Sequence, residues 1–406
     1  MKHVAMIGPE LTPIPPIRGG ATENWIENVC RRMGRYRCTV YSPTDPELPR
    51  RETRNGVDYV RIASGRLSRR VAELFHRPDN RYVKRVLNHL EKTKPDLVHV
   101  QNRPLIAAHL RRYLPSQVPI ILQMHNLYNY LGKYERPEGE WSIPVDLFLA
   151  VSRFVLERER DRLARGAKRL AVLPNGVDTD CYSPSGKEER VRELRRRYGL
   201  DGKRVILYTG KLRENKGVSV LFQAMRTVFQ SDACKDVMLL LVGGTHFGRN
   251  RADRKTDYYR RLMQMISNHE HRVVITGFVR PDEMHFYYGL GDLCVCPSQL
   301  EEGFPSVLLE AMAARLPVVT TRLGGIPELV SHERTGILMD SADDSNELAV
   351  RILELLARRD ECLRLGANAR EEVVRNFSWP VVAEKTESTY DELMESKKWD
   401  SGTRPF

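Results

Sequence analysis

The sequence lacks several features that would define its class at once. It has no apolar run near the roughly 18 residues that a membrane-spanning helix needs, no low-complexity tract and no repeat of fixed period. Its N-terminus enters a predicted strand directly, without a signal peptide. Its seven cysteines are odd in number and scattered, and Cys294 and Cys296 alternate with apolar residues as core positions do. We therefore expect a cytoplasmic protein without structural disulfides or a cysteine-bound metal.

The length and the charge of the chain give the first positive indications. A chain of 406 residues with 41% hydrophobic and 29% charged residues is typical of a globular protein with two domains. The net charge of +12 is uneven, because residues 1–180 hold 31 Lys and Arg against 20 Asp and Glu, whereas residues 181–406 hold 34 against 33. This asymmetry predicts that the first half meets an anionic acceptor, membrane surface or nucleic acid, although a solvated basic face explains it equally well.

Short β-branched runs alternate with amphipathic stretches along the whole chain, which indicates α/β domains with parallel sheets covered by helices. In the first half we expect helices over residues 22–34, 80–93 and 153–166. The polar, charged segment 181–203 is the expected linker. The expected strands are 3–9, 38–43, 57–62, 97–102, 119–126, 147–152 and 169–178 in the first half, and 204–212, 237–244, 272–279, 293–298, 317–321 and 336–340 in the second.

Two carboxylates flank a Gly-Phe-Pro turn in the stretch "EEGFPSVLLEAMAARLPVV". Pro305 suits the first position of a helix that Pro317 would end, so Glu302 should lie in the incoming loop and Glu310 about one turn into the helix. The two acids could then touch separated parts of one ligand. The first amides of that helix favour a phosphate or an oxygen-rich sugar.

Two further segments point to the same kind of ligand. The loop "TGKLRENKG" follows a predicted strand and offers Lys211, Arg213 and Lys216, which suit a diphosphate. In the first half, Gly19 and Gly20 precede a predicted helix and would let a ligand approach backbone amides. Each signal is weak alone, because paired glycines often form plain turns and basic loops are often solvated. Their agreement on an anionic, sugar-like ligand carries the prediction.

These motifs resemble those of a known family, the retaining GT-B glycosyltransferases often called family 4. "EEGFPSVLLE" matches its E-x7-E motif, "GKLRENKG" its G-R-x-x-x-x-K-G loop, "PNGVD" its domain-junction turn and "RGGATE" its N-terminal glycine loop. "LVHVQNRP" and "GGTHFGRN" look most like bacterial spore-coat glycosyltransferases of the CotSA type. The resemblance implies a GT-B fold, with two Rossmann-like parallel-sheet domains facing across a cleft. Residues 1–180 and a returning helix in 379–406 would form the acceptor-side domain, and 181–378 the nucleotide-sugar domain.

The resemblance also assigns roles to residues. Glu310 would bind the ribose of a nucleoside diphosphate sugar, Glu302 a hydroxyl of the transferred sugar, and Lys216 the diphosphate. Lys211 stands where most members have Arg, so it loses the bidentate fork and Arg213 would share its task. His125 would approach the sugar from the first domain. The other implied donor-binding residues are Gly19, Gly20, Gly243, Gly244, Val279, which would line the nucleobase, and the segment of Gly303, Phe304, Pro305, Ser306 and Val307.

The implied reaction is hexosyl transfer from a nucleotide sugar, UDP-linked by preference, with retention at the anomeric carbon. Breaking the bond from sugar to phosphate builds negative charge on the leaving diphosphate, which cations and helix amides stabilise. The reaction therefore needs no metal ion and no cofactor. The acceptor, anionic or belonging to the cell envelope or spore coat, is not encoded by any motif.

Other functions remain open at this stage. The chain could be a coat or scaffold protein that keeps the fold without turnover, as the change at Lys211 suggests, or a nucleotide-sugar epimerase or phosphorylase. Nucleic-acid binding is disfavoured, because no reading helix or stacking motif accompanies the basic residues. Residues 64–92 mix basic and apolar side chains and suggest peripheral membrane contact, although a solvated helix face is favoured. The aromatic segment 126–141 is the expected acceptor loop.

Overall fold

The computed structural model describes residues 1–10, 12–17, 19–63, 80–128, 143–244 and 256–400. The chain forms two compact units. The first comprises Met1–Asn175 and Trp379–Phe406, and the second comprises Gly176–Ser378. The chain thus enters the second unit after Asn175 rather than after residue 180.

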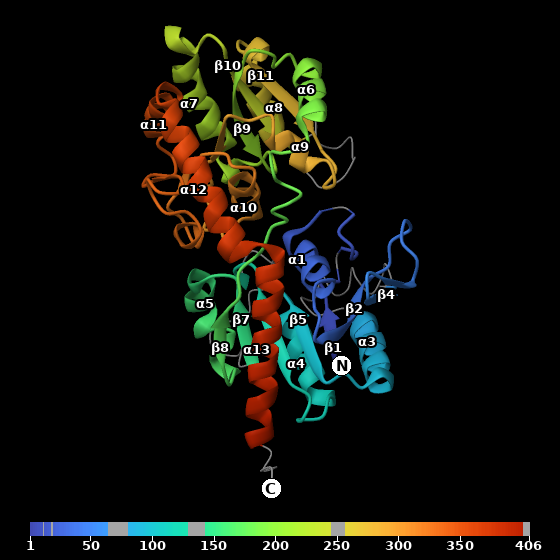
Figure 1. Ribbon diagram of the computed structural model, residues 1–406. Coiled ribbons are helices and arrows are strands. Elements are labelled where there is room, and N and C mark those ends of the chain that lie inside the picture. The colour runs from blue at the N-terminus through green and yellow to red at the C-terminus, as the bar shows by residue number, and fades with distance from the viewer. Residues whose placement is uncertain (11, 18, 64–79, 129–142, 245–255, 401–406) are drawn as a thin grey trace. The chain divides into compact units, whose positions relative to one another are not determined.

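The first unit is built on an eight-stranded sheet with the strand order β3-β4-β2-β1-β5-β6-β7-β8 (Figure 1). Neighbouring strands are parallel, apart from the antiparallel pair β3 and β4. Its strands are β1 (Lys2–Ile7), β2 (Tyr36–Pro43), β3 (Arg51–Arg54), β4 (Val57–Ile62), β5 (Leu97–Gln101), β6 (Ile120–Met124), β7 (Leu147–Ala150) and β8 (Leu170–Val172). The strand order reverses at β1, which has β2 on one side and β5 on the other. Loops that follow β1 and β5 therefore emerge side by side.

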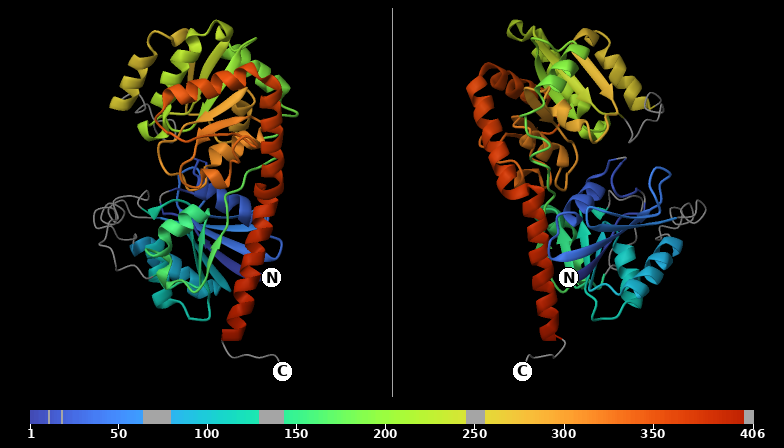
Figure 2. Two further views of the ribbon diagram at one scale, coloured as in Figure 1. Left: turned by 90° about the vertical axis from the view of Figure 1, so that its left-hand side faces the viewer. Right: turned by 45° about the vertical axis from the view of Figure 1, so that its right-hand side comes forward.

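Helices cover this sheet, and the last of them comes from the end of the chain. They are α1 (Ala21–Cys30), α3 (Asn80–Thr93), α4 (Pro104–Tyr113), α5 (Arg153–Arg160) and α13 (Trp379–Asp400). Figure 2 shows α13 running along the first unit. Trp379, Val382 and Tyr390 of α13 are buried in one apolar cluster with residues of β1, β2 and α1. The return of α13 therefore completes the core of the first unit.

The second unit has a six-stranded, fully parallel sheet with the order β11-β10-β9-β12-β13-β14. Its strands are β9 (Arg204–Thr209), β10 (Val237–Val242), β11 (Val273–Gly277), β12 (Leu293–Cys296), β13 (Val318–Thr321) and β14 (Ile337–Met339). Its helices are α6 (Glu188–Arg197), α7 (Val218–Gln230), α8 (Asp257–Ile266), α9 (Met284–Tyr288), α10 (Ser306–Ala313), α11 (Ser345–Ala357) and α12 (Arg359–Phe377). The order reverses between β9 and β12, so the loops after these two strands are neighbours.

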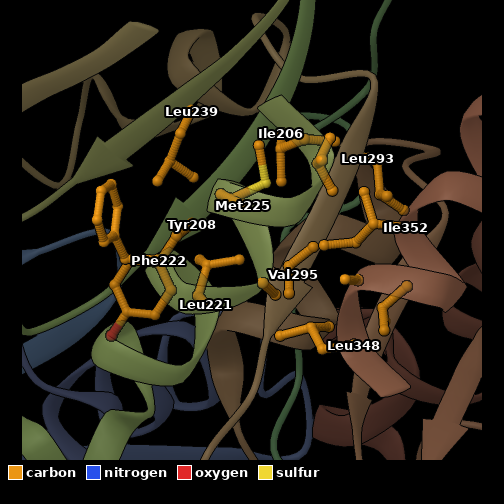
Figure 3. Close-up of a cluster of buried hydrophobic side chains, with 14 of the residues drawn as sticks. Ile206, Tyr208, Leu221, Phe222, Met225, Leu239, Leu293, Val295, Leu348 and Ile352 are labelled. Atoms are coloured by element: carbon orange, nitrogen blue, oxygen red, sulfur yellow. The ribbon is translucent and has the colours of Figure 1, made fainter. Parts of the chain in front are cut away.

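The strands of the second unit are apolar on both faces because helices cover both. Figure 3 shows one side of this core, where Leu221 and Met225 of α7 and Leu348 and Ile352 of α11 pack against the sheet. Residues Val237–Val242 of β10 are all buried. This packing anchors the carboxyl ends of the strands, and hence the loops that carry the candidate site.

Three expectations about local structure are wrong. The helix expected over 22–34 ends at Cys30, and the one expected over 153–166 ends at Arg160, followed by a turn and a short 3-10 helix, Ala164–Gly166, that buries Ala164. The segment expected to be a linker belongs to the second unit: Leu194 of α6 is buried, and Arg195 donates a hydrogen bond to the Leu290 carbonyl at 2.9 Å.

The segment expected to contact membranes is described only in part. Residues 64–79 lie outside the described residues, but α3 is resolved, and its apolar residues Tyr82, Val83, Val86 and Leu90 are buried in the first unit. The apolar side of α3 therefore faces the core, which favours the solvated-face interpretation. No helix in the described parts of the chain is long and apolar enough to cross a membrane.

Candidate functional site

In the second unit, the loops after β9 and β12 meet at the point where the strand order reverses. Gly217 ends the first loop in the left-handed conformation, with φ +71°, and a methyl group here would overlap the Pro297 carbonyl oxygen. The Gln299 N–H donates to the Asn215 carbonyl at 3.1 Å. These contacts lock the two loops together and place Lys216 beside Glu302.

Lys216 and Glu302 form an ion pair. The Lys216 Nζ donates to Oε1 of Glu302, and the Ser298 hydroxyl donates to the same oxygen at 2.9 Å. The backbone of Glu302 is held as well, because its carbonyl accepts the Gly325 N–H at 2.7 Å. Gly324 packs so closely on the Glu302 backbone that a side chain would not fit. The Glu302 carboxylate is thus fixed and only partly exposed.

Two further cations accompany this pair. Burial first, and then the charges of Arg213 and Lys216, lower the pKa of Lys211 to about 8. The Arg213 N–H donates to the Lys211 carbonyl at 2.9 Å and the Lys216 N–H donates to the Arg213 carbonyl at 3.0 Å, so the three cationic residues share one tight loop beside Glu302. The three positive charges repel one another, so the cluster attracts an anion, whose ion pairs with the cations would offset this repulsion.

Glu310 lies in the fifth position of α10 and is held by Tyr288. The Tyr288 hydroxyl donates to Oε2 of Glu310 at 2.8 Å, and the Tyr182 ring packs edge-on against the Tyr288 ring. Burial raises the pKa of Glu310 to about 7, and the hydrogen bond from Tyr288 opposes this rise. Glu310 is therefore a partly buried carboxyl group with a defined orientation, suited to binding hydroxyl groups.

The start of α10 and the glycine loops complete the arrangement in the second unit. Pro305 occupies the N-cap and provides no side-chain hydrogen bond to the first turn, so Ser306 rather than Pro305 is the first helical residue. The Phe304 side chain is buried against Phe377. Gly303 is buried and Val307 is partly exposed.

Gly243 and Gly244 follow β10 and lie against the β9 loop. The Leu212 N–H donates to the Gly244 carbonyl at 3.0 Å, and a side chain on Gly243 would overlap the Gly210 carbonyl. Gly243 also bridges Gly277 at the end of β11, and Val279 follows two positions later, partly exposed. The expected residues of this unit thus lie in the loops that follow its strands or, for Ser306, Val307 and Glu310, in α10 directly after one of these loops. Of the "GGTHFGRN" loop, 245–250 lie outside the described residues, as do 129–141 of the expected acceptor loop.

The first unit brings its own expected residues together at its switch point. Gly19 and Gly20 have φ of +80° and +134° and lead into α1. The Asn102 amide, at the end of β5, donates to the Thr22 hydroxyl at 2.8 Å and accepts the His125 backbone N–H at 2.7 Å. Asn102 therefore ties the first turn of α1, directly after the two glycines, to His125.

The His125 side chain is 2% exposed, and a neutral ring can donate a hydrogen bond from only one of its two nitrogens. Its Nε2 lies 2.8 Å from the Gln101 side-chain oxygen and its Nδ1 lies 3.0 Å from the Asn175 side-chain oxygen. Gln101 continues the network to His99, whose Nδ1 lies 2.7 Å from the Tyr390 hydroxyl. Burial lowers the pKa of His125 to about 4. Within its own unit, His125 is a neutral, buried network member, and its expected contact with a sugar stays a prediction.

This network predicts that acid destabilises the first unit. Burial also lowers the pKa of His99 to about 3, so between pH 6.5 and about 4 the unfolded state binds more protons than the native state. The free energy of unfolding should fall through this range by on the order of 3 kcal/mol per histidine. The raised pKa of Glu310 acts in the opposite direction, but in the second unit.

Tryptophan fluorescence can measure this effect selectively, because Trp25, Trp141, Trp379 and Trp399 all belong to the first unit. Trp25 packs edge-on against both His99 and His125. Urea unfolding followed by fluorescence should show a falling midpoint from pH 7 to 5, with a smaller fall in His125→Gln. A midpoint that is constant over this range would contradict the buried, neutral state of the histidines.

Several residues of the arrangement have no counterpart among the expected ones. They are Ser298, Tyr182, Tyr288, Asn102 and Gly324. Ser298 closes the apolar run "LCVCPS", and its position two residues after β12 was a signal that it would lie at the sheet's carboxyl edge. The others come close to the site only through the fold, and no local pattern marks them.

Comparison with solved structures defines the class. Sucrose-phosphate synthase from Thermosynechococcus elongatus aligns over 98% of this chain and 100% of its own, with 21% identity and a TM-score of 0.78. Anabaena HepE in complex with UDP aligns over 97% and 100%, with 20% identity and a TM-score of 0.73. Two parallel-sheet α/β units of this kind define a GT-B protein, which confirms the expected fold class.

Comparison of sequences defines the family. Residues 19–181 match the model of "Glycosyltransferase Family 4" and residues 203–358 that of "Glycosyl transferases group 1". The chain is 32% identical to Spore coat protein SA of Bacillus subtilis over 96% of its length and 99% of that protein. It is 30% identical to the putative glycosyltransferase YtcC of the same organism, over 97% and 93%. The chain belongs to the group 1, family 4 glycosyltransferases, as its motifs indicate.

Proposed function

We propose that the chain is a retaining hexosyltransferase that moves a sugar from a UDP-sugar to an acceptor of the cell envelope or spore coat, without a metal ion. The observation that carries the proposal is the meeting of Lys211, Arg213 and Lys216 with Glu302 at the switch point of the second sheet. This is the arrangement that a leaving diphosphate needs, because the cations would stabilise the charge that develops on it. The B. subtilis relative's name and the UDP bound to HepE support the choice of acceptor and base.

In this proposal each part of the donor has a partner. Lys216, Lys211 and Arg213 hold the diphosphate with the first amides of α10, and Glu310 takes the ribose hydroxyls. Glu302 gives up part of its contact with Lys216 and accepts a hydrogen bond from a hydroxyl of the sugar. Gly243, Gly244, Gly303 and Val307 admit the donor to the backbone, and Val279 lines the base. Gly19, Gly20 and His125 of the first unit would serve the sugar and the acceptor.

Thermal unfolding with UDP, GDP and ADP, and with their glucose and N-acetylglucosamine conjugates, tests the donor. A ligand at a hundred times its dissociation constant stabilises the native state by about 2.7 kcal/mol. We expect the UDP series to raise the midpoint, and Glu310→Ala to abolish most of the rise by leaving the ribose without its partner. Proton NMR of the product's anomeric signal would then test retention.

A second candidate is a coat protein without turnover. It is favoured by Lys211, which replaces the family's usual Arg and whose pKa of about 8 leaves it partly neutral in mild alkali. The same experiment separates the candidates. If no nucleotide at millimolar concentration raises the midpoint, the transferase proposal is wrong and assembly with coat components becomes the activity to measure.

A further inference from the structure

Glu310 is held by one of two tyrosines that pack together from different parts of the second unit. Tyr288 ends α9, is fully buried, and bonds Glu310 Oε2 at 2.8 Å while its hydroxyl also lies 2.7 Å from Thr209 Oγ1 at the end of β9. Tyr182 lies in the segment that follows the crossing from the first unit. Its ring meets the Tyr288 ring edge-on, with centroids 5.4 Å apart. Tyr182 therefore supports the ring whose hydroxyl holds Glu310.

The loop that presents Tyr182 is itself anchored. The Lys187 ammonium donates to the carbonyls of Cys181 and Ser183, which flank Tyr182 on either side, the second at 2.7 Å. The Cys181 N–H donates to the Asp178 carboxylate at 2.9 Å. Burial lowers the pKa of Lys187, as expected for an ammonium enclosed by protein carbonyls. This loop has the contacts of a rigid support.

We infer that Tyr182 and Tyr288 are positioning residues of the donor site, which orient the Glu310 carboxylate for the ribose and which act together with the Lys187-anchored loop. The inference rests on the proposed function. The hydrogen bond from Tyr288 uses a lone pair on the protein side of the carboxylate, and Tyr182 packs against the Tyr288 ring, so the remaining lone pairs face the ligand in a fixed geometry. A carboxylate without this support would rotate and would bind the ribose hydroxyls less well.

Binding of UDP and of inorganic pyrophosphate by isothermal titration calorimetry tests the inference on Tyr182→Phe and Tyr288→Phe. Tyr288→Phe removes a hydrogen bond to a charged group, so we expect UDP affinity to fall roughly tenfold, and Tyr182→Phe should lower it in the same direction. Pyrophosphate lacks the ribose, so its affinity should change less than twofold. The matched control is Tyr287→Phe, since this neighbouring hydroxyl pairs with Tyr198 at 3.2 Å instead of Glu310. It should bind both ligands like the wild type.

A double-mutant cycle separates orientation from general damage. In the Glu310→Gln background the tyrosine changes should add less than twofold to the loss of UDP affinity. Lys187→Met leaves both tyrosine hydroxyls in place. If the loop supports Tyr182, this variant should lower the affinity for UDP, as Tyr182→Phe does. The inference is overturned if the tyrosine variants weaken UDP and pyrophosphate alike, or if their effects persist fully in Glu310→Gln.

The outcomes also distinguish this inference from the proposed function. If the wild type binds UDP and Glu310→Gln weakens it, but both tyrosine variants bind like the wild type, only the positioning role is wrong. If the wild type binds neither UDP nor another nucleotide, the proposed function fails, and the inference fails with it.

Discussion

Replacing Lys216 by alanine is expected to lower kcat/KM for sugar transfer by about a hundredfold or more. The Lys216 ammonium is fixed by Glu302 at the switch point of the second sheet, beside Lys211 and Arg213. Removing one preorganised donor from a developing negative charge typically costs a factor of about 10² to 10³. The effect can be measured as the rate at which nucleoside diphosphate is released from the nucleotide sugar. The nucleotide sugar is the one that raises the thermal midpoint, and water or an added compound serves as the acceptor.

Two variants make this result specific. Lys235→Ala removes the same charge from an exposed site in the same unit, where Lys235 pairs with Asp232 at 2.9 Å, and should leave kcat/KM unchanged. Lys216→Arg keeps the charge with a different shape and should recover part of the activity. A Lys216→Ala rate within threefold of the wild type would show that another group holds the diphosphate.

The second large effect is on stability. Gly217→Ala should lower the free energy of unfolding of the second unit by about 3 kcal/mol or more. An alanine at this position would be held in the unfavourable left-handed backbone conformation, and its methyl group would also overlap the Pro297 carbonyl. The substitution also separates the two loops that bring Lys216 to Glu302. Because all four tryptophans belong to the first unit, unfolding of the second should be followed by far-UV circular dichroism in urea.

Gly199→Ala is the matched control for this prediction. Gly199 also has a left-handed backbone, with φ +64°, but a methyl group there would meet nothing within 4 Å. It should therefore show only the backbone cost, about 1 to 2 kcal/mol. Equal losses in the two variants would mean that the loop contact at Pro297 contributes nothing.

The type of most strands could be predicted from the sequence because the central strands of both sheets are buried. Continuous apolar runs such as Val237–Val242 leave little doubt about a strand, and Glu302 and Glu310 could be placed on either side of a helix start by the proline between them. The loops at the switch points followed from the same strands. The sequence does not predict which of these loops are neighbours, because the order of the strands in each sheet is set by the fold.

What escaped prediction depends on contacts between distant segments. Tyr182 and Tyr288 reach Glu310 only because α9 and the junction loop pack beside α10, and Asn102 meets His125 only because β5 and β6 are adjacent.

Strand β3 was also missed, although the sequence contains a local pattern that indicates it. Asn55 and Gly56, both with positive φ, form the tight turn that joins β3 to β4, and such a pair is a strong hairpin indicator even beside the charged residues of β3.

The discontinuous make-up of the first unit has a consequence for its synthesis on the ribosome. Its sheet is translated first, but Trp379, Val382 and Tyr390, which fill its core, are translated last. The second unit is continuous from Gly176 to Ser378, so it can finish folding while the first still exposes the apolar groove that α13 will cover. A nascent chain that has emerged up to Ser378, with α13 still inside the ribosome, would therefore carry a native-like second unit and an incomplete first one, the species most exposed to aggregation and to chaperones.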